Sequence, residues 1–204
     1  MHHHHKTEHH HQKRQLITPD LVARAQAEAP WLSVAFREEP AAELHGLDQN
    51  NPKILKYISS FPNLMTVDYK VMDHKTHKMV ATGWKMGEVD ETPWCSCFVA
   101  WCLRTAGQPV FGVSAGAKSW LNYGMPLTTP KLGAIAVVFK KHAGAAITSS
   151  GYHVAFFVGG NDHKFVLFGG NQGDRVCGKE FQGWTVKGYR WPTALQSALP
   201  SNVA

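Results

Sequence analysis

The sequence predicts an α+β fold, with helices in the N-terminal half and an antiparallel sheet in the C-terminal half. Three observations predict it. Helix start signals precede apolar residues at helical spacing before residue 107. Strand-like segments follow, separated by Gly, Asn and Asp, at residues 133–140, 152–160, 164–171 and 184–192. The chain has 204 residues, of which 44% are hydrophobic and 18% charged, which suits one globular domain with a substantial core.

The N-terminal segments resemble scaffold helices. Residues 18–39 predict a helical region that Pro30 interrupts. Residues 51–61 predict a second helix, with Asn51 as N-cap and Pro52 at the first helical position.

The next segment alternates weakly between apolar and polar residues. Residues 66–72 and 78–82 predict two strands, and residues 73–75 could turn a hairpin between them.

A sharper helix signal covers residues 92–107. Thr92 is expected to cap this helix, Pro93 to occupy the first helical position, and Gly107 to end it. Cys95 then lies in the opening turn, where free backbone N–H groups and the helix dipole favour a thiolate. The same N–H groups can form an oxyanion hole. Residues 114–124 predict a short helix or an ordered loop.

The four cysteines do not suggest a disulfide framework, because Cys95, Cys97 and Cys102 fall within eight residues. No second Cys pair or His pair at zinc-finger spacing accompanies them, so no metal or other cofactor is expected. Cys97 points about 200° around the helix from Cys95, and Cys102 is expected to be a buried apolar residue. Cys177 has no assigned role.

A cysteine nucleophile needs a base and a group that orients the base. His153 is the candidate base, because it lies in a strongly apolar predicted strand. If residues 161–163 form a three-residue hairpin loop, Asn171 lies directly opposite His153, with Cβ atoms about 5 Å apart. Two alternatives remain open: a satisfied core histidine, and a simple turn at residues 169–174.

Charge and composition exclude several classes. The net charge is +6, of which +2 lies in the His-rich residues 1–14, expected to be an added tag or a disordered tail rather than a metal-binding tract. No basic run follows that would indicate a nucleic-acid partner. No apolar stretch is long enough to insert in a membrane, and no secretory signal is evident, so the chain is expected to be made in the cytoplasm.

Several blocks in series resemble the papain-like NlpC and CHAP cysteine peptidases that cut bacterial peptidoglycan, over about residues 30–192. The resemblance is closest to the branch with a Pro-Trp-Cys nucleophile motif and a Gly-Gly-Asn-Gln motif. The blocks are TPWCSCFVAWCLRTAG, AKSWLNYG, GAIAVV, YHVAFFVGG, FGGNQGDRV and GYRWP. The resemblance implies one papain-like catalytic domain over residues 15–204, in which N-terminal helices pack on a small antiparallel sheet. The segment at 59–89 is longer than the family pattern and is expected to be an insertion.

The resemblance implies a catalytic triad of Cys95 as nucleophile, His153 as general base and acid, and Asn171 as orienting residue. The expected activity is hydrolysis of an amide bond in the peptidoglycan stem peptide, as an endopeptidase or an N-acetylmuramoyl-L-alanine amidase. The family includes antibacterial effectors of type VI secretion, which implies action in a target cell's periplasm, a secretion-apparatus carrier and a cognate immunity protein. Alternatives are a phage-type endolysin, acyl transfer or deamidation by the same triad, and a non-hydrolytic wall-binding module.

Overall fold

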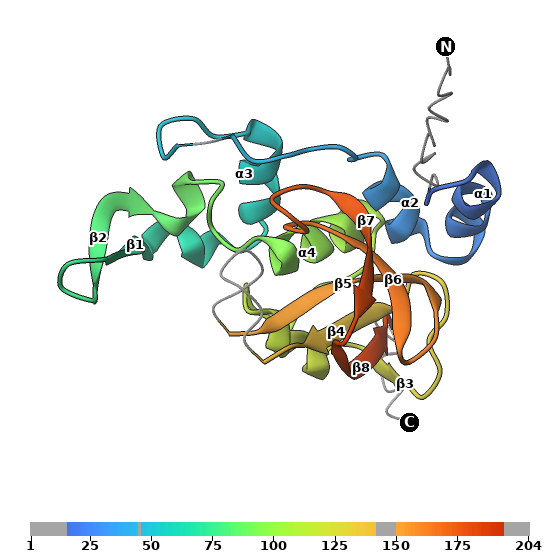
Figure 1. The fold of residues 1–204 in the computed structure, drawn as a ribbon. Coiled ribbons are helices and arrows are strands. Elements are labelled where there is room, and N and C mark those ends of the chain that lie inside the picture. The colour runs from blue at the N-terminus through green and yellow to red at the C-terminus, as the bar shows by residue number, and fades with distance from the viewer. Residues whose placement is uncertain (1–15, 45, 142–149, 194–204) are drawn as a thin grey trace, which may run out of the picture.

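The computed structural model describes residues 16–44, 46–141 and 150–193, and its fold is α+β, as predicted. Helices lie along one side of a six-stranded antiparallel sheet (Figure 1). A separate two-stranded sheet projects at the left of the view, at the end of the molecule away from the first two helices. The predicted tail at residues 1–14 lies outside the described residues.

The N-terminal helices begin where the sequence predicts. Helices α1 (Pro19–Glu28) and α2 (Pro30–Phe36) meet at Pro30, and the side chain of Thr18 caps α1 by accepting from an N–H of its first turn. Asn51 caps α3 (Pro52–Ile58) in the same way. None of the helices in the described ranges is long and apolar enough to cross a membrane.

Helix α4 (Cys95–Thr105) begins later than predicted, and the assignment of Thr92 as its N-cap is wrong. The Thr92 hydroxyl instead donates a 2.6 Å hydrogen bond to the carbonyl of Met86, and no side chain caps the helix. Trp94 is the N-cap residue, and Cys95 becomes the first residue of the helix. Gly107, at φ 75°, follows the helix as expected, in a left-handed conformation that suits glycine.

The six-stranded sheet has the order β3-β8-β4-β5-β6-β7, with every pair antiparallel. Its strands are β3 (Met125–Leu127), β4 (Ile135–Phe139), β5 (Tyr152–Gly160), β6 (Lys164–Gly169), β7 (Cys177–Gln182) and β8 (Thr185–Trp191). Four of them match the predicted strands, whereas β3 and β7 were not predicted. A 3-10 helix, η3 (Ala117–Asn122), occupies the predicted helix or loop.

The alternation of β5 divides the core into two clusters. Val154 and Phe156 face α4 and the other helices, in the larger cluster. Ala155 and Phe157 face the opposite side, where the strands enclose a second apolar cluster that includes Phe181 of β7. Helix α4 is therefore held against one face of β5 by a buried apolar interface.

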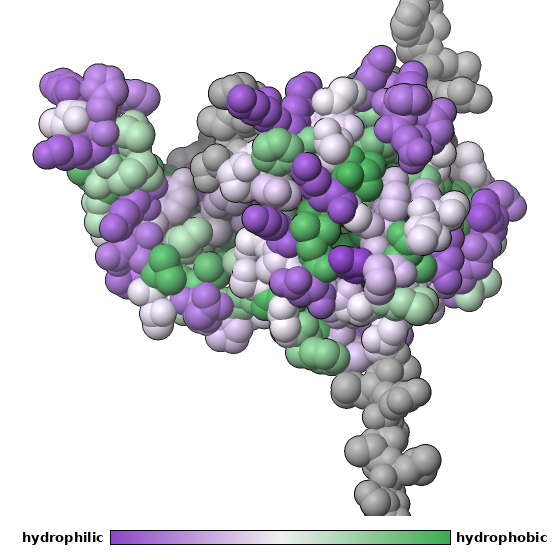
Figure 2. Space-filling model, turned by 90° about the horizontal axis from the view of Figure 1, so that it is seen from below, coloured by the Kyte–Doolittle hydropathy of each residue, from purple (hydrophilic) through white to green (hydrophobic). Residues whose placement is uncertain are grey.

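The segment predicted as an insertion forms an arm. Strands β1 (Asp68–Asp73) and β2 (Lys78–Lys85) pair as the predicted hairpin, between the 3-10 helices η1 (Pro62–Thr66) and η2 (Met86–Glu88). Figure 2 shows this arm at the left of the view, standing away from the body.

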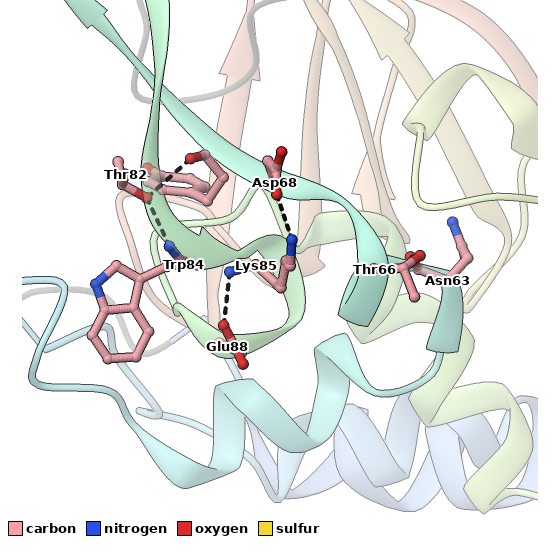
Figure 3. Close-up of polar contacts among 8 residues, drawn as sticks. Asn63, Thr66, Asp68, Thr82, Trp84, Lys85 and Glu88 are labelled. Atoms are coloured by element: carbon pink, nitrogen blue, oxygen red, sulfur yellow. Dashed lines mark hydrogen bonds and ion pairs between the residues drawn. The ribbon is translucent and has the colours of Figure 1, made fainter.

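Polar contacts hold the base of the arm (Figure 3). The Lys85 ammonium lies 2.5 Å from an oxygen of Asp68, and the backbone N–H of Lys85 donates to Glu88. Farther out, the cross-strand pair Met72 and Met79 is 46% and 55% exposed. The arm is thus fixed at its base and largely solvated along its strands.

Gly170 provides a test of the packing between α4 and the sheet. A Cβ at Gly170 would overlap the Trp94 ring and lie 2.7 Å from the Cβ of Phe98. Gly170→Ala is expected to lower the free energy of unfolding in urea by about 1–3 kcal/mol, because this interface has no room to expand. Gly159→Ala is the matched control, since a Cβ there meets no atom within 4 Å. Equal changes for the two variants would contradict this account.

Candidate active site

Cys95 occupies the first turn of α4 with its sulfur directed at β5. The residue is 1% exposed, and the backbone N–H groups of Val154 and Ser96 lie near its sulfur. Burial raises the pKa of the Cys95 thiol to about 11, although these N–H groups oppose the rise. The expectation that the helix start alone makes Cys95 a thiolate therefore does not hold for this structure, because desolvation outweighs the N–H groups.

The thiol pKa values of the other three cysteines are also raised. Burial raises the pKa of Cys97, and raises that of Cys102 well above its usual range. Cys177 is half-buried, its pKa is raised by burial, and its thiol donates to the carbonyl of Gln172 at 3.3 Å. Among the four, Cys95 is the cysteine that also lines a pocket.

This pocket is small, at about 210 Å³, compared with the ~300–1,000 Å³ typical of sites for drug-sized ligands. Its walls are mostly small or apolar. The lining residues are Met86, Pro93, Cys95, Ala115, Gly116, Ala117 and Ser150. Met86 belongs to η2, so the segment at 59–89 contributes one wall. The pocket has room for a single group of a larger substrate beside the Cys95 sulfur.

His153 lies fully buried near the start of β5. Its ring stacks on Phe181, with ring centroids 5.7 Å apart and planes 16° from parallel. Burial lowers the pKa of His153 to about 4, against a hydrogen bond with Gln172 that raises it, while the nearby Lys179 lowers it further. The imidazole is therefore neutral at pH 7.

Strands β5 and β6 pair in the predicted register near His153, but the turn that joins them differs from the prediction. Backbone hydrogen bonds in both directions join Asn161 and Lys164, so the turn contains two residues instead of three. A register shift between Phe157 and Gly159 then moves the pairing by one residue. As a result Phe157 pairs with Leu167, which is the pairing that the predicted three-residue loop requires.

Asn171 does not occupy the position opposite His153 that the register predicts. Strand β6 ends at Gly169, and Asn171 has φ 54°, so the chain turns away before the ladder reaches it. The amide that contacts His153 is that of the next residue, Gln172, whose Oε1 lies 3.1 Å from the imidazole Nε2. The sequence predicts an amide of this motif beside His153, and in the structure that amide belongs to Gln172 instead of Asn171.

The Cys95 sulfur and the His153 imidazole lie on opposite faces of β5, and no hydrogen bond joins them. The sulfur lies against the N–H of Val154, the residue directly after His153. The imidazole projects to the other face of the strand, with Ala155. Its Nδ1 is buried and has no hydrogen-bond partner among the residues that the structure describes.

Glu43, which belongs to no motif in the sequence, contacts the residue before Cys95. The indole N–H of Trp94 donates a 2.7 Å hydrogen bond to Glu43. Burial raises the pKa of Glu43 to about 7; the Trp94 bond opposes this, and the carboxylates of Asp174, Asp90 and Glu91 add to it. Glu43 could not be predicted, because it is about fifty residues from Trp94 in the sequence.

No family model, curated protein or solved structure matches the chain. Within the described residues, no group of three or more His, Cys, Asp and Glu side chains is arranged to hold a metal ion. The arguments for function therefore depend on the geometry and on the sequence blocks.

The buried neutral imidazole makes stability depend on pH. Below pH 6.5 the unfolded chain protonates His153 while the folded protein does not until about pH 4, so stability falls as the pH falls. Between pH 7 and pH 5, His153 is expected to remove about 2 kcal/mol from the free energy of unfolding. Urea unfolding of His153→Leu should lack this component. The control His163→Asn, at an exposed turn histidine, should retain it, and parallel pH profiles for wild type and His153→Leu would contradict the assignment.

Proposed function

We propose that this protein is a papain-like peptidoglycan amide hydrolase of the NlpC/CHAP type, in which Cys95 is the nucleophile and His153 the general base and acid. The observation that carries the proposal is the position of the Cys95 sulfur. It lies at the start of a helix, against the N–H that follows His153, and beside a pocket. A nucleophile, a basic lone pair and backbone donors are the components that acyl transfer requires.

The proposed reaction has two halves. Cys95 transfers its proton to His153, a step that requires the imidazole to turn from the opposite face of β5 toward the sulfur. The thiolate attacks the carbonyl carbon of a stem-peptide amide, while backbone N–H groups at the start of α4 stabilise the oxyanion. His153 then gives the proton to the amine nitrogen, the C–N bond breaks, and a thioester remains on Cys95. Water, deprotonated by His153, attacks the thioester, and the carboxylate product leaves as the thiol reforms.

The neutral resting state shapes this mechanism. With a thiol of high pKa and an imidazole of low pKa, Cys95 and His153 rest uncharged at pH 7. Charge separation then has to accompany attack, as in general-base catalysis, instead of preceding it as a stored thiolate–imidazolium pair. Substrate that fills the pocket and supplies polar groups would favour that separation.

The sequence blocks extend the proposal to biological context. The TPWC block precedes and starts α4, the YHVAFFVGG block is β5, and the FGGNQ block ends β6 and forms the turn after it. Their resemblance to type VI effectors favours action on the wall of a rival cell after specialised secretion, with an immunity protein as partner. A phage-type endolysin would use the same chemistry.

A second candidate is a non-hydrolytic module that binds a wall fragment. Two observations favour it: no hydrogen bond joins Cys95 to His153, and burial opposes ionisation of both groups. On this alternative the pocket binds a ligand and the thiol is inert.

Digestion of purified peptidoglycan separates the two candidates. Wild-type protein is expected to release new muropeptides, resolved by liquid chromatography and mass spectrometry, with fragment masses that identify the bond cut. Cys95→Ala should lower the rate by about a thousand-fold or more, because it removes the nucleophile.

Cys102→Ala is the matched control, since this cysteine is buried two turns along the same helix and does not line the pocket. It should keep its activity once folding is verified by circular dichroism. Identical muropeptide profiles for wild type and Cys95→Ala would refute hydrolysis by Cys95, and cosedimentation with intact peptidoglycan without cleavage would support the binding module.

A further inference from the structure

We infer that Gln172, and not Asn171, is the residue that positions His153, and that it holds the imidazole as the Nε2–H tautomer with Nδ1 as the basic nitrogen. The catalytic meaning of this inference rests on the proposed hydrolase function. The tautomer itself can be measured without any substrate.

The orientation of the Gln172 amide follows from its two ends. Its Nε2 lies 3.3 Å from the carbonyl oxygen of Leu167 and 2.5 Å from that of Cys177. Carbonyl oxygens only accept hydrogen bonds, so the amide NH₂ must face them. A flipped amide would set its own oxygen against both carbonyls, at a site where Gln172 is only 4% exposed. The amide oxygen Oε1 therefore faces His153.

This orientation determines where the imidazole proton lies. Oε1 can only accept, so the nitrogen at 3.1 Å, Nε2 of His153, must donate. A neutral imidazole carries a single N–H, and Nδ1 is then left with its lone pair. Nδ1 is also the ring nitrogen that has no hydrogen-bond partner within the described part of the chain. Stacking on Phe181 fixes the plane of the ring.

The turn after β6 explains why the amide comes from residue 172. Asn171, Gly173 and Asp174 all have positive φ. In this tight turn the Gln172 side chain reaches the carbonyls of Leu167 and Cys177. The backbone N–H of Gln172 donates to the carbonyl of Arg175 at 3.1 Å.

Gly169 leaves the space that the amide needs. A Cβ at Gly169 would lie 2.6 Å from the Cβ of Ala155 and 3.7 Å from Oε1 of Gln172. The glycine thus permits the close approach of β6 to β5 beside the bond between Gln172 and His153.

An amide suits both states of the proposed reaction. When Nδ1 is protonated, the imidazolium still donates through Nε2 to the same Gln172 oxygen, so this hydrogen bond is compatible with both protonation states. A carboxylate at this place would be a buried charge in the resting enzyme. Gln172 is thus a positioning residue that acts through His153 and does not touch substrate.

Imidazole nitrogen NMR of ¹⁵N-histidine-labelled protein at pH 7 tests the inference. The wild type is expected to show His153, assigned by its loss in His153→Leu, with a protonated Nε2 and an unprotonated Nδ1. Gln172→Ala should give a mixture of the two tautomers, whereas the control Asn171→Ala should keep the Nε2–H form.

Peptidoglycan hydrolysis adds a second measurement. Gln172→Ala is expected to lower kcat about 10- to 100-fold with little change in KM, and Asn171→Ala to change it less than about 3-fold. An Nδ1–H tautomer in the wild type, or loss of the Nε2–H tautomer in Asn171→Ala alone, would overturn the inference even if Gln172→Ala does not fold. If the wild type has the Nε2–H tautomer but cuts no peptidoglycan, the hydrolase proposal fails and the positioning role of Gln172 stands.

Discussion

The packing of α4 against β5 is the constraint on which the rest of the site depends. The helix buries Phe98 and Cys102 in the same cluster as Val154 and Phe156. This interface places the first residue of the helix against the start of β5. The Cys95 sulfur therefore lies near the backbone N–H of Val154. The position of Cys95 at the pocket and near the N–H that follows His153 depends on one apolar contact between a helix and a strand.

That contact also sets the electrostatics. Excluding water from Cys95 and His153 favours their uncharged forms, which raises one pKa and lowers the other. The helix start and the backbone N–H groups reduce the cost of a thiolate but do not cancel it. Under the proposed hydrolase function, both groups stay uncharged until substrate binds.

Much of this arrangement was predictable from local signals. Pro30 and the Thr18 and Asn51 caps mark helix boundaries, and the alternation of β5 correctly separates His153 from Val154. The failures depend on single non-local or conformational choices. Nothing in the sequence shows that the Thr92 hydroxyl bonds to the carbonyl of Met86 instead of capping α4.

The placement of Gln172 likewise depends on one left-handed residue after β6, and β7 was missed because its solvated positions carry charged residues. The measurement that tests the central claim most directly is mass spectrometry of the acid-quenched protein during turnover of a purified muropeptide. The account predicts a transient acyl adduct on the peptide that contains Cys95, absent in Cys95→Ala. Cleavage of the muropeptide by both proteins, with no such adduct on Cys95, would contradict it.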